Sequence, residues 1–248
     1  MMSSIGKEFM EKTKFQYLDR SDQSRNIPQP PLEMEYDASR RVRELPRHDN
    51  IKIRSFDLRQ AIEGRRSIRT YSQEPLTIEE LSYLLWVTQG VVHATPGATF
   101  RNVPSAGARH ALETYLLINN VGDVPEGIYR FLAIENRLVE VNTDPDIADR
   151  VTEGCLGQDF IRKSAVTFIW VADAYRMKWR YGERGYRYLH LDAGHVCQNL
   201  YLSAGSLDCG VCAIAAFSDD HMNDLLELDG VEQFVIYIAS VGKNKAGF

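Results

Sequence analysis

Residues 65–71 decide how the rest of the chain is interpreted, and they read Arg65-Arg66-Ser67-Ile68-Arg69-Thr70-Tyr71. They follow a short helical pattern in which Leu58 and Ile62 lie one turn apart and Gly64 marks the stop. Guanidinium groups donate a fork of N–H bonds and a hydroxyl can reach a remaining oxygen, so this set suits a phosphate group. Basic residues at a helix end also compensate the helix dipole, and the stretch alone leaves both interpretations open.

The chain before this stretch, residues 1–55, is predicted to be an extended N-terminal arm. Its run Ile27-Pro28-Gln29-Pro30-Pro31-Leu32 must be extended, because each proline fixes its own φ and disfavours a helical residue before it. Such a segment cannot bury Ile27 and Leu32 by itself, so we expect the arm to wrap a partner subunit. A basic cluster follows, which consists of Arg40, Arg41, Arg43 and Arg47. It could bind a phosphate, but the simpler interpretation is a solvated surface or one that pairs with acidic residues of a partner chain.

Helices and strands follow the stretch without strict βαβ alternation, which predicts an α+β fold with helices on a mainly antiparallel sheet. A capping box over 77–80 starts a helix that ends at Gly90, and residues 91–109 are expected to form a long loop. The predicted strands are Thr114–Asn119, Gly127–Ala133, Arg137–Val141, Ala165–Ala172 and Gln233–Val241. The other predicted helices are Asp144–Glu153, Tyr188–Ala204 and Asp219–Leu228.

Composition excludes several classes of protein. With 29 Lys and Arg against 34 Asp and Glu, the 248-residue chain has a net charge of −5, which argues against nucleic-acid binding. Its 44% hydrophobic and 25% charged residues are globular values. No apolar run approaches the ~20 residues of a membrane helix, and the first residues hold no signal-peptide core. Four cysteines are too few for a disulfide scaffold, so we expect a cytoplasmic protein without a membrane partner.

The common catalytic and metal-binding motifs are missing from the sequence. Cys209 and Cys212 have no second cysteine pair, and His190 and His195 do not share a helix face, so no metal site is expected. There is no G-x-S-x-G elbow, no phosphate-binding P-loop and no G-x-G-x-x-G turn. A nucleotide would therefore bind in another way, and the catalytic residues stay unknown.

Four blocks of sequence, in order, resemble the nitroreductase superfamily of FMN-dependent oxidoreductases. The first is 65–71 with Pro75-Leu76-Thr77, and the second, 101–110 running into 113–115, is similar to the branch that contains the azoline (thiazole/oxazole-forming) dehydrogenases. The third is the helix 190–204 with Gly210 and 213–217, and the fourth is Ser240-Val241-Gly242-Lys243. The blocks define a domain over residues 56–248.

The resemblance implies an intertwined homodimer with FMN in grooves at the subunit interface. The residues implied at the phosphate and ribityl chain are Arg65, Arg66, Ser67, Lys243 and Lys245. Arg69 would approach the pyrimidine side of the flavin, and Ala215 and Ala216 would lie near its N5 atom. The loop from the other subunit that would line the ring is Pro104, Ser105, Ala106 and Gly107.

The activity implied is ping-pong hydride transfer from NAD(P)H through flavin N5 to a small organic acceptor. Two alternatives stay open: an azoline dehydrogenase-like oxidation of a peptide heterocycle, and a flavin-binding protein without turnover. Ala215-Ala216 stands where many relatives have an acidic residue and glycine, and the loop at 104–107 lacks the Asn and Gln of relatives that cleave nitroaromatics. His110 and Tyr115 are candidate proton donors, with a role in the core as the simpler interpretation.

Overall fold

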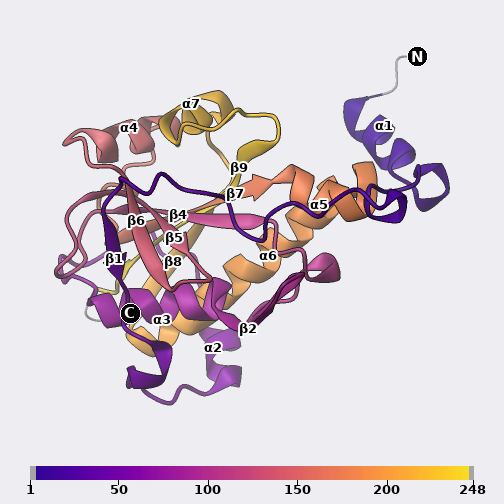
Figure 1. The fold of residues 1–248 in the computed structure, drawn as a ribbon. Helices are drawn as coiled ribbons and strands as arrows, with labels where there is room; N and C mark the ends of the chain where they lie inside the picture. Colours follow the sequence, from indigo (N-terminus) through magenta and orange to yellow (C-terminus); the bar gives the residue numbers. More distant parts are fainter. Residues whose placement is uncertain (1–3, 246–248) are drawn as a thin grey trace.

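The computed structural model describes residues 4–245, and its centre is a seven-stranded sheet. The strand order is β1-β6-β5-β4-β7-β9-β8, and every neighbouring pair runs antiparallel (Figure 1). The strands are β1 (Val42–Glu44), β4 (Leu112–Ile118), β5 (Gly127–Leu132), β6 (Arg137–Asn142), β7 (Val166–Asp173), β8 (Cys209–Ile214) and β9 (Gln233–Lys243). This is the α+β, mainly antiparallel architecture that the sequence predicts.

Helices cover both faces of the sheet, as Figure 1 shows. One face packs against α3 (Ile78–Gln89), α5 (Ala174–Tyr181) and α6 (Gly185–Ala204), and the other against α4 (Ile147–Gly154) and α7 (Asp219–Leu225). Side chains alternate along a strand, so Leu116 belongs to the core of the first face and Leu117 to that of the second. Because both faces are buried, β4 and β7 are apolar almost throughout.

The predicted capping box is confirmed at the start of α3. The Glu80 N–H donates to Thr77 Oγ1 (3.2 Å), and the Thr77 N–H donates to Glu80 Oε2 (2.9 Å). The preceding helix, α2 (Leu58–Gly64), begins in a similar way, because the Asp57 carboxylate accepts from the Gln60 N–H (3.0 Å). Both helix starts are therefore fixed by local sequence.

The expectation of a single long loop over 91–109 is wrong for its first part, which forms a hairpin of β2 (Val91–Thr95) and β3 (Ala98–Arg101). Pro96 and Gly97 supply the turn, and Thr95 Oγ1 accepts from the Ala98 N–H (3.1 Å). Helix α5 is also missing from the prediction, because charged residues, among them the buried Arg176, interrupt the helical spacing of Ala174, Met177 and Tyr181. The Asp173 carboxylate starts it by accepting from the Arg176 N–H (3.2 Å).

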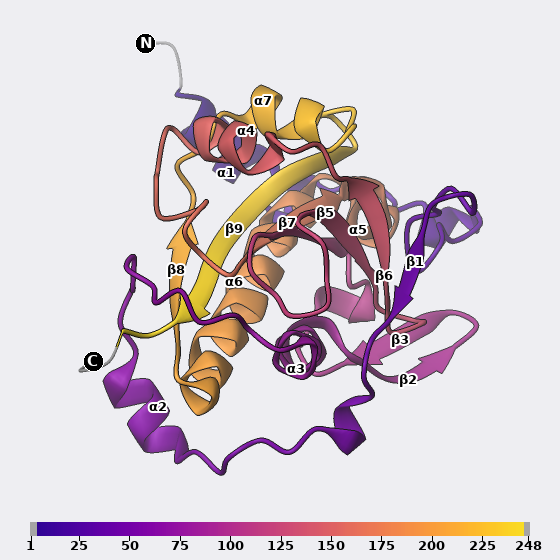
Figure 2. The same ribbon diagram turned by 90° about the vertical axis from the view of Figure 1, so that its left-hand side faces the viewer.

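The N-terminal residues pack along their own chain. All residues of α1 (Ile5–Lys12) are exposed, whereas the segment that follows is tied to α5 and the sheet. The Trp179 indole N–H donates to Ile27 O (2.9 Å), and Arg130 Nη2 donates to Met34 O (2.9 Å). The chain then passes α3 on its way from β1 to α2 (Figure 2). Over residues 4–245, no helix is both long and apolar enough to cross a bilayer.

Candidate functional site

The basic stretch 65–71 lies along the free edge of the sheet. The Ile68 N–H donates to Val211 O (2.9 Å) in β8, and the Ser72 N–H donates to Lys243 O (2.9 Å) at the end of β9. Strand β8 is an edge strand, and its first residue pairs with the last residue of β9. Three segments far apart in the sequence therefore meet at one corner of the sheet.

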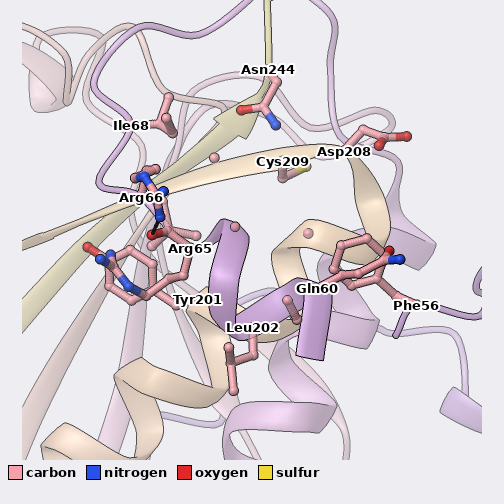
Figure 3. Close-up of a pocket in the computed structure, with 15 residues that line it drawn as sticks. Phe56, Gln60, Arg65, Arg66, Ile68, Tyr201, Leu202, Asp208, Cys209 and Asn244 are labelled. Carbon is pink, nitrogen blue, oxygen red and sulfur yellow. Dashed lines mark hydrogen bonds between the residues drawn. The ribbon is translucent and has the colours of Figure 1, made fainter. Parts of the chain in front are cut away.

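A cavity of about 300 Å³ opens at this corner between α2, α6 and the start of β8 (Figure 3). The polar residues of its lining are Gln60, Arg65, Arg66, Tyr201, Asp208 and Asn244, and Gly210 lies among them. The Asp208 carboxylate pairs with Arg54 (3.0 Å), outside the lining. Phe56 and Leu202 add apolar walls. The cavity thus combines positive charge, amide groups and an apolar surface, which suits an organic ligand with an anionic end.

The two arginines of the cavity are held in different ways. The Arg65 guanidinium lies over the Tyr201 ring, with 5.2 Å from Cζ to the centroid. Arg66 Nη1 donates to Glu63 O (2.9 Å) and to Arg65 O (2.8 Å), so part of this side chain satisfies the end of α2. Both interpretations of the basic stretch therefore apply. Arg66 compensates the end of α2, and Arg65 and Arg66 together give the cavity a positively charged wall.

Tyr201 of α6 joins the stretch to β8. Its hydroxyl accepts from the Ala213 N–H (2.8 Å) and lies 3.1 Å from Ser67 Oγ. The sequence predicts Ser67 at the site but not Tyr201, because the helical pattern of 188–204 does not distinguish this tyrosine from the neighbouring apolar residues. Tyr201 fixes the spacing between the basic stretch and the edge strand.

The structure does not bring the amino group of Lys243 to this cavity. Lys243 Nζ donates to Leu207 O (3.0 Å) and pairs with Glu80, in a separate hollow next to the start of α3. The next residue, Asn244, points into the cavity, because successive side chains of a strand face opposite ways. Its Oδ1 atom is buried and, among the described residues, has no hydrogen-bond partner. Lys245 lies beyond β9 and is exposed.

The loop 104–107 is fixed to a different part of α6. Ser105 Oγ donates to Asp192 Oδ2 (2.6 Å), and the Ala106 N–H donates to Asp192 Oδ1 (3.3 Å). Asp192 and Tyr201 are nine residues apart, about two and a half turns, so they leave α6 on opposite sides. Within one chain the loop and the cavity therefore lie across α6 from each other.

The remaining predicted residues lie around β8. Ala215 and Ala216 follow its last residue and are exposed, and Gln158 Nε2 donates to Ala216 O (2.9 Å). Arg69 is exposed next to Cys212; burial raises the pKa of the Cys212 thiol, and the charge of Arg69 opposes that rise. These positions could contact a ligand that extends from the cavity along the edge strand.

The two candidate proton donors are buried. Burial, with the positive charges of Arg101, Arg109 and Arg176, lowers the pKa of His110 to about 3, so its ring is neutral at neutral pH. Tyr115 lies in the core beneath α4, and its burial raises the pKa of its hydroxyl. Neither residue lines the cavity described above.

Comparison with known proteins settles the family. The family model described as Nitroreductase family matches residues 62–243. The chain belongs to the Nitroreductase family. A nitroreductase-like protein of Methanocaldococcus jannaschii is 34% identical over 200 residues, which cover 81% of this chain and 95% of the relative. The resemblance read from four sequence blocks is thus confirmed.

Solved structures share the nitroreductase fold. A nitroreductase-like protein of Anabaena variabilis is 32% identical with a TM-score of 0.65, and the match covers 76% of this chain and 38% of the Anabaena chain. A chain of the E. coli microcin synthetase McbBCD complex has a TM-score of 0.60 at 20% identity (82% and 78% covered). The NADPH:FMN oxidoreductase of Vibrio harveyi has a TM-score of 0.55 at 15% identity (76% and 69% covered). The last two likenesses are of fold alone, and the match to the family supports an oxidoreductase.

Proposed function

We propose that this chain is an FMN-dependent oxidoreductase of the cytoplasm, in which NAD(P)H reduces the flavin and a small organic acceptor then oxidises it. The observation that carries the proposal is the cavity at the sheet edge, where Arg65, Arg66 and Asn244 converge in a Nitroreductase-family chain. A guanidinium matches the oxygens of a phosphate in charge and geometry. The positive charge of Arg65 and Arg66 therefore supports binding of the anionic end of the ligand in this cavity.

The residues present fit such a cofactor. Asn244 Oδ1 is a buried acceptor with no partner in the described chain, so a ribityl hydroxyl would satisfy it. Gly210 lets the basic stretch and Asn244 approach β8 closely, because a Cβ there would come within 2.7 Å of Asn244 Oδ1 and 2.6 Å of Ile68 Cβ. The absence of a side chain at Gly210 thus keeps Asn244 in its place at the cavity, where its buried acceptor supports a ligand site.

Bound flavin would supply the two-electron chemistry, and the protein would orient it and tune its charge. In this proposal Arg65 would hold the phosphate, and Ser67 would hydrogen-bond to the ribityl chain. Arg69 would place a cation at the pyrimidine side, where positive charge favours the reduced, more negative form of the ring. Ala215 and Ala216, which follow β8, are exposed residues, and their backbone N–H groups would donate to the ring.

The position of α6 supports a homodimer with the cofactor at its interface. The cavity and the loop 104–107 lie on opposite sides of this helix, so one chain cannot place both on one ligand. Between these two sides α6 carries an exposed stripe that includes Leu191, His195 and Gln198, with Leu191 59% exposed. A second copy packed on this stripe would bring its own loop towards the cavity of the first.

The visible spectrum of the purified protein tests the proposal. We expect a yellow protein, or a colourless one that FMN makes yellow, with a flavin that NADH or NADPH bleaches in anaerobic stopped-flow experiments. Mixing the reduced protein with quinones or nitroaromatics then identifies the acceptor class. A protein that FMN does not reconstitute would reject the proposal.

A second candidate is oxidation of a peptide heterocycle, as in azoline dehydrogenases. The fold likeness to a chain of the microcin synthetase McbBCD complex supports it, as does the sequence of the loop 101–110. Flavin that NAD(P)H does not reduce, but that an azoline-containing peptide does, would favour this candidate. A flavin that is reduced neither by NAD(P)H nor by the azoline-containing peptide would indicate a flavin-binding protein without turnover, provided that no acceptor oxidises the dithionite-reduced flavin either.

A further inference from the structure

The loop that follows β3 has an unusual backbone. Gly107, Ala108 and His110 have φ angles of 58°, 51° and 43°, so three of four consecutive residues lie in the left-handed region. Ala108 and His110 carry a Cβ, for which this region costs free energy. Such a backbone persists only where its surroundings over-determine it, and it is found most often at functional sites.

Helix α5 closes one side of this loop. A Cβ at Gly107 would lie 2.5 Å from the Tyr181 hydroxyl and 2.8 Å from Arg180 Nε. The backbone at position 107 therefore packs against the ends of the Tyr181 and Arg180 side chains, and its positive φ favours glycine there. Contact with α5 alone leaves the other side of the loop unrestrained.

Asp192 and Ser105 restrain that other side. The Asp192 side chain, 5% exposed, accepts from both Ser105 Oγ (2.6 Å) and the Ala106 N–H (3.3 Å). Ser105 Oγ in turn accepts from the His110 N–H (2.9 Å), across the strained residues. One buried carboxylate thus holds the start of the loop directly and its end through a serine.

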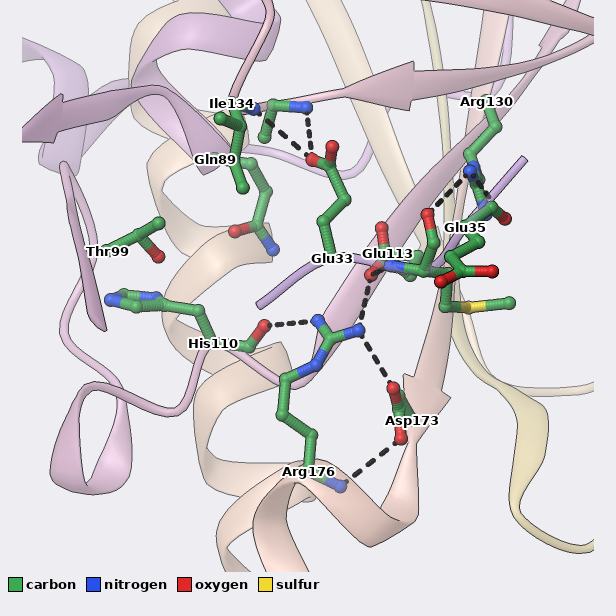
Figure 4. Close-up of polar contacts among 12 residues, drawn as sticks. Glu33, Glu35, Gln89, Thr99, His110, Glu113, Arg130, Ile134, Asp173 and Arg176 are labelled. Atoms are coloured by element: carbon green, nitrogen blue, oxygen red, sulfur yellow. Dashed lines mark hydrogen bonds and ion pairs between the residues drawn. The ribbon is translucent and has the colours of Figure 1, made fainter. Parts of the chain in front are cut away.

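A buried arginine holds the end of the loop a second time (Figure 4). Arg176 Nη1 donates to His110 O (3.1 Å), and Nη2 donates to Glu113 Oε1 (2.7 Å) and Asp173 Oδ2 (2.8 Å). Arg176 is 1% exposed, so two carboxylates compensate its charge in the core. Both flanks of the strained segment are therefore attached to rigid helices.

We propose that Asp192 and Ser105 are positioning residues that fix the backbone of 104–107 in the conformation presented to the flavin of the partner subunit. This inference rests on the proposed function for the identity of the ligand, whereas the clamp itself belongs to the single chain. Removing either hydrogen-bonding group lets the loop relax its left-handed residues. Only a fraction of the molecules then has the loop conformation that binds the flavin ring, and the apparent FMN dissociation constant rises as that fraction falls.

Hydrogen exchange of the protein without FMN tests the clamp, and FMN titration tests its consequence. In Ser105→Ala the His110 N–H loses its acceptor, and in Asp192→Ala both bonds to the helix are lost. We expect amide exchange over 104–110 to become about tenfold faster, and the FMN dissociation constant to rise about tenfold, from hydrogen bonds of ordinary strength. Asp192→Asn, which keeps one acceptor oxygen, is expected to give smaller changes and covers the case in which Asp192→Ala does not fold.

The matched control is Ser164→Ala. Like the partly buried Ser105, the buried Ser164 donates a short hydrogen bond, to Ile161 O (2.7 Å), but it lies away from the loop. A merely structural role would make both serine variants lose thermal stability alike, with exchange over 104–110 unchanged. Unchanged exchange in Ser105→Ala and Asp192→Asn would overturn the clamp. A wild-type protein that binds no FMN would instead reject the proposed function, while the exchange data still decide whether the clamp exists.

Discussion

The guanidinium of Arg65 lies 5.2 Å from the ring centroid of Tyr201, and the hydroxyl of that ring accepts a hydrogen bond from the Ala213 N–H. This stacking holds the arginine at the edge of the cavity, and none of residues 4–245 gives it an acidic partner. An arginine held by an aromatic face keeps its N–H groups available for an anion, whereas one held by a carboxylate would not. Under the proposed function, the pair would hold Arg65 in position for the phosphate of FMN before the cofactor binds.

Arg65→Ala should weaken FMN binding about 10- to 100-fold, because a charge-assisted contact contributes about 1.5–3 kcal/mol. Quenching of FMN fluorescence during titration measures the loss. Arg59→Ala is the control, since Arg59 is exposed on the neighbouring helix and pairs with Glu63. Equal affinities of Arg65→Ala and wild type would place the phosphate elsewhere.

Tyr201→Phe should destabilise the chain by about 1 kcal/mol, because the partly buried Ala213 N–H loses its hydrogen-bond acceptor while the aromatic ring that stacks on Arg65 remains. Urea unfolding measures the change. Tyr17→Phe, at an exposed tyrosine of the N-terminal arm, is expected to leave the free energy of unfolding unchanged. If Tyr201→Phe unfolds like the wild type, the hydroxyl does not hold β8 in place.

Much of the sheet could be predicted from the sequence, because its patterns are local. Strand β7 is a continuous apolar run bounded by polar residues, and α3 begins at a capping box. Helix α5 could not be predicted, because Arg176 is buried there only through carboxylates that come from β4 and the end of β7. A charge that is compensated by tertiary contacts looks like a surface residue in the sequence.

The candidate site was predictable in its segments and less so in its side chains. The convergence of 65–71 with the ends of β8 and β9 follows from the family resemblance. Which of Lys243 and Asn244 faces the cavity depends on the parity of β9, and no sequence pattern fixes that parity at a strand end. Asp192 did carry a signal, as a carboxylate among Leu189, Ala193 and Val196 on the buried face of α6.

Ala108→Gly should stabilise the protein by about 0.5–1 kcal/mol, because glycine adopts a positive φ without the penalty that alanine has. Ala106→Gly, in the same loop, is the matched control, and we expect it to destabilise by a similar amount through the entropy of the unfolded chain. Urea unfolding of both variants measures the difference. Ala108→Gly that is no more stable than Ala106→Gly would mean that the loop stores no strain at Ala108.

Glu113→Gln should destabilise the protein by about 3–5 kcal/mol, because the buried charge of Arg176 loses a partner. Burial opposes ionisation of Glu113, but the surrounding arginines outweigh it and hold the pKa of this carboxyl below its usual 4.5. A lowered pKa in the folded state contributes stability above pH 4.5 that is lost as the pH falls through the folded value. The deficit of Glu113→Gln relative to wild type should therefore shrink in urea unfolding below pH 4.5, and a constant deficit would contradict the ionised pair.

His110→Asn should flatten the pH dependence of stability between pH 6.5 and 3. The ring of His110 is buried among Arg101, Arg109 and Arg176, which lowers its pKa from 6.5 to about 3. Below pH 6.5 the unfolded chain binds a proton that the folded chain refuses, so the wild type loses about 1.4 kcal/mol per pH unit from this group as the pH falls. Asparagine tolerates the positive φ at this position and does not titrate. Urea unfolding at pH 7, 6 and 5 measures the slope, with His93→Asn on the exposed hairpin as the control that keeps it. If His110→Asn and wild type lose stability in parallel, protonation of the His110 ring does not oppose folding.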